Sequence, residues 1–93
     1  MEFEWDPDKA DSNLGRHGVS FDEAKTVFGD PLAKTVTDEL HSTEEEEREL
    51  TIGVSTAGNT VVVWHTQRGE PARTRIIGAR RATAAERRSY ESE

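Results

Sequence analysis

The sequence predicts an α+β fold with the element order β-α-α-β-β-β-β-α, in which an antiparallel sheet carries two N-terminal helices on one face and is followed by a short C-terminal helix. Three observations predict this fold. Helix-start and helix-stop residues punctuate the first 31 positions, β-branched and alternating apolar runs fill positions 32–81, and a further helix-start motif follows at Thr83. Because no interior stretch of the 93 residues reads as a linker, we expect a single domain over residues 1–93.

The first helix is expected from Pro7 to His17. Asp6 is a good cap residue, Pro7 suits the first helical position because its missing N–H would have no partner there, and Gly18 can adopt the left-handed conformation that ends a helix. The preceding "EFEW" is too short for more than an edge strand.

The second helix is expected to begin after Ser20, since Glu23 three positions later completes the pattern of a capping box. Gly29 and Pro31 end it. Its apolar residues share one face and must pack on another element; they are Phe21, Ala24, Val27 and Phe28. The same capping pattern recurs at Thr83 and predicts a C-terminal helix through about Glu91, which carries Arg87, Arg88 and Tyr90.

Four segments between these helices read as strands: "LAKTVT", "RELTIGVS", "NTVVVWHTQ" and "ARTRIIGAR". The turns "STAGN" and "RGEP" join the last three closely, which predicts an antiparallel meander. Strand alternation places Val61, Val63 and His65 on one face of the third segment, and Val62 and Trp64 on the other. Both faces are partly apolar, so the pattern leaves open which one would meet a ligand.

The formal charge of −7 is distributed unevenly along the chain. Residues 1–49 hold fifteen acidic and five basic side chains, whereas residues 50–93 hold four acidic side chains and seven arginines. Arginine suits bidentate contact with phosphate or carboxylate. The "EEEE" run at 44–47 reads as a solvated loop, and the cationic C-terminal half as a surface for an anionic ligand.

Several protein classes are excluded by composition. Without cysteine there is no disulfide framework, thiolate metal site or cysteine nucleophile. The N-terminus lacks the pattern of a secretory signal, and no run approaches the roughly 20 apolar residues of a membrane span. We therefore expect a cytoplasmic protein, and we expect no metal or other cofactor because no His and carboxylate cluster stands at ligand spacing.

Two motifs carry a resemblance to a known family. The N-terminal frame "FEWDPDKADSNLGRHGVSFDEAKTVFGDP" and the later "RIIGARRATAAERRSY", with a loop from Asp38 to His41 and an "EER" between them, resemble the BrnT family of toxins from prokaryotic type II toxin-antitoxin modules. The resemblance runs from Phe3 to Tyr90. It implies a small ribonuclease with a RelE-like fold, acting on RNA and inhibiting translation, in a hetero-oligomer with a ribbon-helix-helix antitoxin called BrnA. Gly78 departs from the family pattern, which usually has serine there.

RNA cleavage without a metal needs a base for the 2′-hydroxyl proton, an acid for the leaving oxygen and cations for the charge that grows on phosphorus. Arginine supplies the last of these, so a histidine, Tyr90 or a carboxylate would have to move protons. The candidate catalytic residues are Arg80, Arg75, Arg48, His65 and His41, and the candidate RNA-binding residues are Arg68, Arg73 and Arg81. Arg80, at the junction of the last strand and the last helix, is the preferred phosphate contact.

The arginines and His65 also have structural interpretations. An arginine near the end of the chain could pair with Glu86 or with the acidic first half, and His65 could be a buried structural histidine. Strict alternation puts Arg75 and Arg80 on opposite faces unless a bulge near Gly78 rotates the strand. A second function class stays open as well: a non-catalytic binding module, or an inactivated toxin, that docks an acidic partner through its arginines, which the pI of about 4.9 favours.

Overall fold

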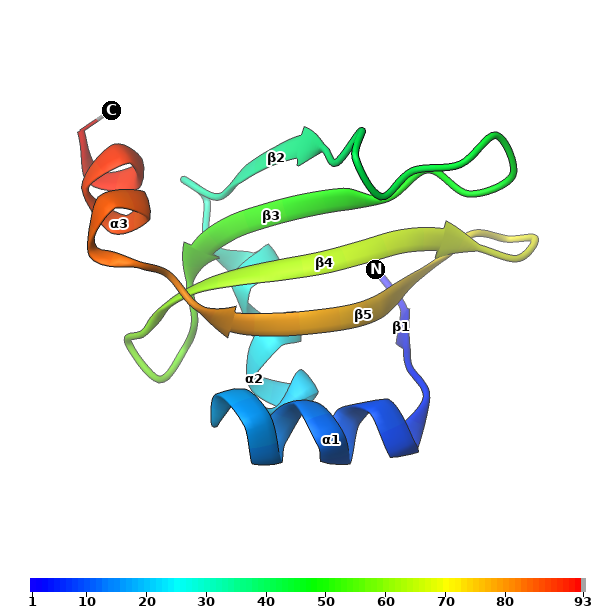
Figure 1. Ribbon diagram of the computed structural model, residues 1–93, viewed down its shortest axis with the longest axis horizontal. Helices are drawn as coiled ribbons and strands as arrows, with labels where there is room; N and C mark the ends of the chain where they lie inside the picture. Colours follow the sequence, from blue (N-terminus) through cyan, green and yellow to red (C-terminus); the bar gives the residue numbers. More distant parts are fainter. Residues whose placement is uncertain (93) are drawn as a thin grey trace.

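The computed structural model describes residues 1–92 and shows a sheet with helices at its edges and on one face (Figure 1). In chain order the elements are β1 (Phe3–Glu4), α1 (Pro7–His17), α2 (Phe21–Thr26), the 3-10 helix η1 (Val27–Gly29), β2 (Lys34–Thr37), β3 (Glu49–Val54), β4 (Thr60–Arg68), β5 (Arg73–Arg81) and α3 (Ala84–Glu91). The α+β class and the sequence of strands and α-helices agree with expectation. The short η1 between α2 and β2 was not expected.

The sheet is mixed rather than antiparallel throughout, which corrects the expected topology. Its strand order is β1-β5-β4-β3-β2, with an antiparallel meander from β2 to β5 and a parallel pairing of β1 with β5. A strand of two residues has no periodicity that could reveal its direction. It is held in place by Glu4, whose carboxylate accepts hydrogen bonds from Arg73 and Arg75 of β5.

The capping residues act largely as expected. Asp6 accepts a hydrogen bond from the Asp8 amide, and Gly18 ends α1 with φ of 69°. At α2 only half of the capping box forms: Ser20 accepts from the Glu23 amide, but the Glu23 carboxylate turns away to Ser55 and Asn59 of the β3–β4 turn. The Glu23 side chain therefore stabilises that turn instead of capping its own helix.

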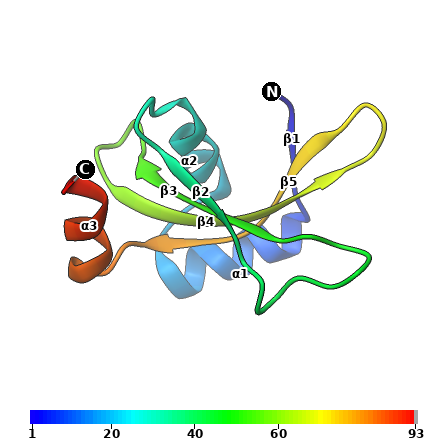
Figure 2. The same cartoon turned by 90° about the horizontal axis from the view of Figure 1, so that it is seen from above.

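The hydrophobic core lies between the sheet and the segment formed by α2 and η1 (Figure 2). Its buried residues are Val19, Phe21, Ala24, Val27, Val61, Val63, Ile76 and Ala79. All those from β4 alternate on one face, as a half-buried strand requires. That face is closed to ligands, and the opposite face of the sheet is the one shown in Figure 1.

Helix α1 is placed differently from the expected position on the sheet face, since it lies along the edge of β5 (Figure 1). It contains no buried residue. Asn13 makes the hydrogen bonds to this edge that a neighbouring strand would otherwise make. Its side-chain amide donates to the Ala79 carbonyl at 2.8 Å and accepts from the Ala79 amide at 3.1 Å. It also donates to the Val19 carbonyl at 3.0 Å. One amide side chain thus covers a sheet edge that would otherwise expose unpaired backbone groups.

Strand β5 contains a bulge that decides where its arginines point. Ile77 is the extra residue, lying between the positions that pair with the neighbouring Trp64 and His65 of β4. The bulge reverses the alternation beyond it, so that Arg75 and Arg80 both lie on the face opposite the core. The sequence allowed for such a rotation, and the structure places it at Ile77.

Within residues 1–92, no helix has the length and apolar character needed to cross a membrane.

Candidate functional site

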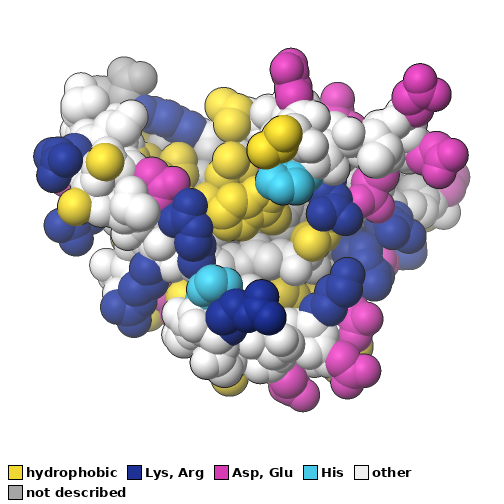
Figure 3. All heavy atoms as spheres, viewed as in Figure 1, with side chains coloured by type: hydrophobic (Ala, Val, Ile, Leu, Met, Phe, Trp, Pro, Cys, Tyr) yellow, Lys and Arg dark blue, Asp and Glu magenta, His cyan; other side chains and the backbone are white. Residues whose placement is uncertain are grey.

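The sheet face opposite the core carries a hydrophobic patch surrounded by basic side chains (Figure 3). We call this the open face; strand register and alternation assign to it Lys34, Val36, Leu50, Ile52, Val62, Trp64, Arg75 and Arg80. A groove of about 260 Å³ lies where the face meets α3, and Glu86, Ser89 and Tyr90 form its α3 wall. Exposed apolar surface with a charged rim is typical of a binding face.

A continuous chain of contacts crosses the open face and joins two candidate catalytic residues, His41 and Arg80. His41 Nδ1 lies 2.7 Å from Asp38 Oδ2, and the same oxygen accepts a hydrogen bond from Trp64 Nε1 at 3.1 Å. The Arg80 guanidinium lies over the Trp64 ring, 5.3 Å from its centroid, and donates two hydrogen bonds to Glu86 at 2.7 and 3.0 Å. We call this the contact chain.

The local fold of the loop after β2 positions the histidine end of the contact chain. Asp38 donates its amide to the Arg48 carbonyl at 2.8 Å, which extends the β2–β3 ladder by one pair. Ser42 Oγ donates to the Asp38 carbonyl at 2.7 Å and accepts from the Arg48 amide at 2.9 Å. The loop is therefore tied at its base, and His41 is held three residues beyond Asp38.

The protonation states within this pair follow from its contacts. The hydrogen bond with His41 is the main reason that the pKa of Asp38 lies below its usual value, and Trp64 lowers it further. An ionised Asp38 accepts from the protonated Nδ1 of His41, which leaves Nε2 as the basic nitrogen. The His41 side chain is 56% exposed, so this nitrogen is accessible to a substrate.

Arg80 is anchored at the start of α3. Glu86 Oε1 accepts both from Arg80 and from the Thr83 amide at 2.8 Å, while Thr83 Oγ1 accepts from the Glu86 amide, so the capping box is complete. Arg80 is the largest cause that lowers the pKa of Glu86, to about 2. A carboxylate thus already occupies the position at which a helix N-terminus and an arginine fork converge on an anion.

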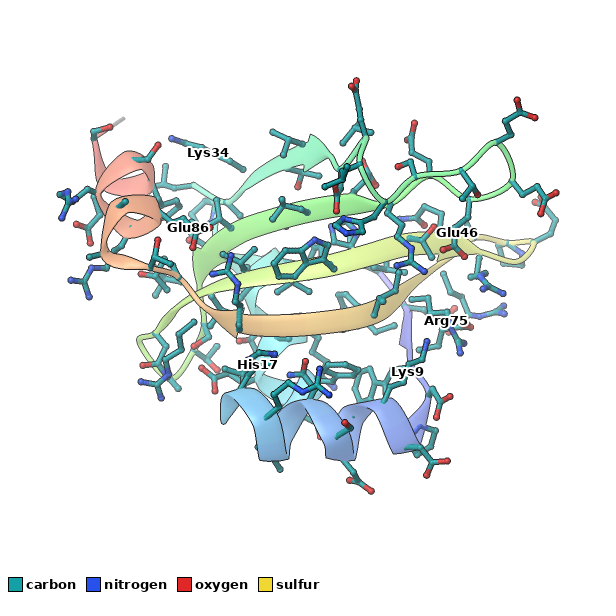
Figure 4. All side chains as sticks on the ribbon, in the orientation of Figure 1. Lys9, His17, Lys34, Glu46, Arg75 and Glu86 are labelled. Atoms are coloured by element: carbon teal, nitrogen blue, oxygen red, sulfur yellow. The ribbon has the colours of Figure 1, made fainter. Side chains whose placement is uncertain are left out.

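The other arginines of this side are also paired with carboxylates. Glu4 lies 2.6 Å from Arg73 Nε and 2.8 Å from an Arg75 amino group, and these bonds, first that from Arg73, lower the pKa of Glu4. Glu46 joins Arg48 at 2.8 Å and Arg68 at 3.2 Å (Figure 4). The structural interpretation, in which an arginine near the end of the chain pairs with Glu86 or with the acidic first half, agrees with these ion pairs. Arg81 is an exposed residue at the end of β5.

His65 lies apart from the contact chain, on the core face. Its side chain is packed edge-on against Phe28, and its Nε2 lies 2.8 Å from Thr51 Oγ1, which in turn contacts Thr35. The residue is 3% exposed, and burial lowers its pKa to about 4. This location fits the structural interpretation of His65 and puts its ring out of reach of a ligand on the open face.

The buried neutral His65 predicts acid sensitivity. Its pKa falls from 6.5 in an unfolded chain to about 4 in the fold, so protons bind preferentially to the unfolded chain, and stability decreases as the pH falls from 6.5 towards 4. The full shift corresponds to about 3 kcal/mol. We expect His65→Gln to remove this part of the pH dependence and His41→Ala to retain it, as measured by thermal unfolding midpoints at pH 7, 6, 5 and 4. Parallel curves for wild type and His65→Gln would contradict the assignment.

Tyr90 is the remaining candidate for proton transfer from sequence analysis. Its hydroxyl donates to Asp30 Oδ2, which also accepts from the Val54 amide. The bond to Asp30 is the main cause that raises the pKa of Tyr90 to about 12. The phenol therefore stays protonated at neutral pH and ties α3 to the loop before β2, which is a structural task.

Sequence reasoning missed three members of the contact chain. The available signal for Asp38 was its position three residues before His41. The same loop contains Ser42, whose hydroxyl could bond to the base of the loop. The partnership of Trp64 with Arg80 across two strands had no local signal, because it depends on the register and on the bulge at Ile77. Glu86 was expected to pair with an arginine but was not placed in the site.

Gly78 lies next to the bulge at Ile77. A Cβ at this position would meet only Asn13 Oδ1, at 3.8 Å, which is ordinary van der Waals contact. The backbone around Gly78 therefore has room for a β-carbon. Within residues 1–92, no cluster of three or more His, Cys, Asp or Glu residues could hold a metal ion.

Comparison with known proteins gives two positive findings. The model of the family described as "Ribonuclease toxin, BrnT, of type II toxin-antitoxin system" matches residues 5–86. The crystal structure of the Brucella abortus ribonuclease toxin BrnT superposes with a TM-score of 0.66 at 21% sequence identity, covering 89% of this chain and 97% of that one, which shows a shared fold. No curated protein sequence matches the chain significantly.

Proposed function

The chain belongs to the BrnT family of ribonuclease toxins of type II toxin-antitoxin systems, and from this membership we propose that it is a metal-independent endoribonuclease that cuts RNA on the open face and so inhibits translation in the cytoplasm. Membership of a type II module also implies an antitoxin partner, and we infer that this partner is a ribbon-helix-helix protein of the BrnA kind.

The contact chain is the observation that supports this activity best. It joins a carboxylate-oriented histidine, His41, to an arginine, Arg80, across a single indole ring on an accessible face. An oriented imidazole and a positioned guanidinium are a base and a charge stabiliser, which are two of the groups that RNA cleavage needs. Trp64 between them offers an aromatic surface on which a base of the RNA can stack.

The proposed reaction uses these residues in order. His41 Nε2 accepts the proton of the 2′-hydroxyl, and the resulting oxygen attacks the neighbouring phosphorus while the 5′ oxygen departs and takes a proton from solvent. Arg80 leaves Glu86 and binds the phosphate, so that its fork neutralises the charge that grows in the transition state. Asp38 keeps Nδ1 of His41 protonated and stabilises the imidazolium that forms.

Metal independence is proposed because guanidinium groups supply the charge that a divalent ion would otherwise supply. We expect the purified protein to cleave single-stranded RNA in the presence of EDTA at the same rate as in its absence, because no step of the proposed reaction uses a metal. The measurement is a cleavage time course on a labelled RNA, with and without EDTA and with magnesium added back. Activity that disappears with EDTA and returns with magnesium would refute the proposal.

We propose that the antitoxin covers the open face. The apolar groove against α3 can accept apolar side chains, while the arginines can accept acidic ones in place of Glu4, Glu46 and Glu86. A partner bound there would hide His41 and Arg80 together, which would explain neutralisation by simple occlusion.

A non-catalytic binding module is the second candidate, and one observation favours it. The arginines of the open face are already paired with carboxylates of the same chain. An acidic segment of a partner protein could replace these carboxylates. Expression without any partner separates the two functions. Growth arrest with loss of mRNA supports the ribonuclease, whereas harmless overproduction of a folded protein supports the binding module.

A further inference from the structure

Helix α1 has a cationic face that neither the core nor the contact chain uses. Although it is 11 residues long, α1 has no fully buried residue; Ala10 packs against the hydrophobic core, and Asn13 hydrogen-bonds to Val19 and Ala79. Lys9 and His17 stand one helical turn to either side of Asn13, so all three lie on the side that faces β5 (Figure 4). Lys9 and His17 are exposed beside the bonded Asn13, so their side chains remain available to a ligand.

A groove of about 160 Å³ separates this face from β5. It is lined by Lys9, Ser12, Asn13, Arg16, His17 and the bulge residue Ile77. From Lys9 to His17 the helix advances by on the order of 12 Å. The groove is therefore long enough for an extended segment of a polymeric ligand rather than for a single small ion.

The charges of this groove differ from those of the open face. Arg75 and Arg80 are each bound by a carboxylate of the chain, but among residues 1–92 no carboxylate forms an ion pair with Lys9 or Arg16. Both side chains are exposed. They can bind an anion without first releasing an internal partner, and so at a lower free-energy cost than the open-face arginines.

The groove and the open face are neighbours on the same side of the molecule. Basic side chains and a histidine gather below the hydrophobic patch, over α1 and β5 (Figure 3), and Figure 4 shows Lys9 and Arg75 in the same part of the view. Ile77 links the two surfaces, since it lines the groove and belongs to the strand that carries Arg80. An RNA strand that is bound at Arg80 can therefore continue across β5 into the groove.

We propose that the α1 groove binds the sugar-phosphate backbone of the RNA on one side of the cleaved bond. This inference rests on the proposed ribonuclease function and adds a second binding site to it. Lys9 and Arg16 contact phosphates, and the His17 ring and Ser12 hydroxyl donate hydrogen bonds to phosphate or ribose oxygens. The groove anchors the strand, and the contact chain carries out the chemistry.

The test uses the double variant Lys9→Gln/Arg16→Gln and a single-stranded 2′-O-methyl RNA, which binds but cannot be cleaved. Its affinity is expected to fall about tenfold at moderate salt, and the slope of log affinity against log salt is expected to decrease by about 1.4, at about 0.7 per neutralised phosphate. With cleavable RNA, we expect KM to rise and kcat to stay unchanged, because no group of the contact chain is altered.

The control is Arg87→Gln/Arg88→Gln on α3, which removes the same charge from exposed residues outside the groove. Equal losses of RNA affinity in both double variants would show that net charge alone sets the affinity, and this result would overturn the proposal. Unchanged affinity in the α1 variant would also overturn it. Normal RNA binding with weakened antitoxin binding would identify the groove as a protein interface instead. Wild-type protein that neither binds nor cleaves RNA would refute the proposed function itself, a separate result from the failure of this inference.

Discussion

Replacing Arg80 with alanine is expected to lower RNA cleavage by a factor on the order of 10² to 10³ while leaving the fold intact, as the loss of one preorganised donor typically does. The Trp64 ring beneath Arg80 holds its guanidinium on the open face, where the fork can exchange the carboxylate of Glu86 for a phosphate. The capping box of Thr83 and Glu86 does not require Arg80, and α3 should therefore remain in place.

Arg80→Lys should recover only part of the lost activity, because an ammonium keeps the charge and loses the bidentate geometry. Arg88→Ala on the exposed part of α3 is the control and should change the rate little. The measurements are RNA cleavage, toxicity in cells and the thermal unfolding midpoint of each variant. Full toxicity of Arg80→Ala, or a loss of activity that tracks unfolding, would make Arg80 a structural ion-pair residue only.

Helix ends were predictable from sequence because they depend on residues that are adjacent in the chain. The sequence predicts the whole helix from Pro7 to His17, with Asp6 and Gly18 at its ends, and it also predicts the capping box at Thr83. The half-formed box at Ser20 shows where such reasoning stops. Glu23 has the right spacing, but the β3–β4 turn offers its carboxylate better partners, and that competition is visible only in three dimensions.

Strand pairing was predictable only where the strands are consecutive. The meander follows from its short turns, whereas the parallel pairing of β1 depends on a contact between Glu4 and arginines about 70 positions away. The bulge at Ile77 could be suspected from Gly78, but its position had to be observed. Because that single residue sets the faces of Arg75 and Arg80, the geometry of the site depended on the least predictable feature of the sheet.

The choice between the two central histidines illustrates the same limit. Both His41 and His65 were candidates, and strand alternation put His65 on a face with Val61 and Val63. The sequence could not say which face the helices cover. Once α2 and η1 are seen to pack on that side, His65 becomes part of the interior and His41, in a loop that seemed merely acidic, becomes the accessible histidine.

The pairing of arginines with internal carboxylates explains how an acidic chain can carry a cationic binding face. Glu4, Glu46 and Glu86 hold five arginines between them, so much of the positive charge of these side chains is offset until a ligand displaces the carboxylates. Under the proposed function, RNA binding would exchange internal ion pairs for phosphate contacts. Such a surface would disfavour nonspecific binding of nucleic acid, because weak ligands cannot offset the ion pairs that they break.

Replacing His41 with alanine is expected to lower kcat by a factor on the order of 10² to 10⁴, the range typical for the loss of a general base. The pH dependence that a general base imposes on the wild-type rate should be absent from the variant. His41 is an exposed loop residue whose only side-chain partner among residues 1–92 is Asp38, so the fold should tolerate the change. The measurements are single-turnover cleavage of RNA between pH 5 and 8 and the unfolding midpoint.

Asp38→Asn separates positioning from proton transfer, since an amide at residue 38 can still contact His41 and Trp64 but no longer stabilises an imidazolium. This variant should keep a pH-dependent rate with a lower maximum, whereas His41→Ala loses the dependence altogether. Glu39→Ala, an exposed neighbour in the same loop, is the matched control and should behave as wild type. If His41→Ala retained both the rate and the pH dependence of the wild type, the base would have to be sought elsewhere. The contact chain would then be a scaffold that holds Trp64 and Arg80 in place for binding RNA.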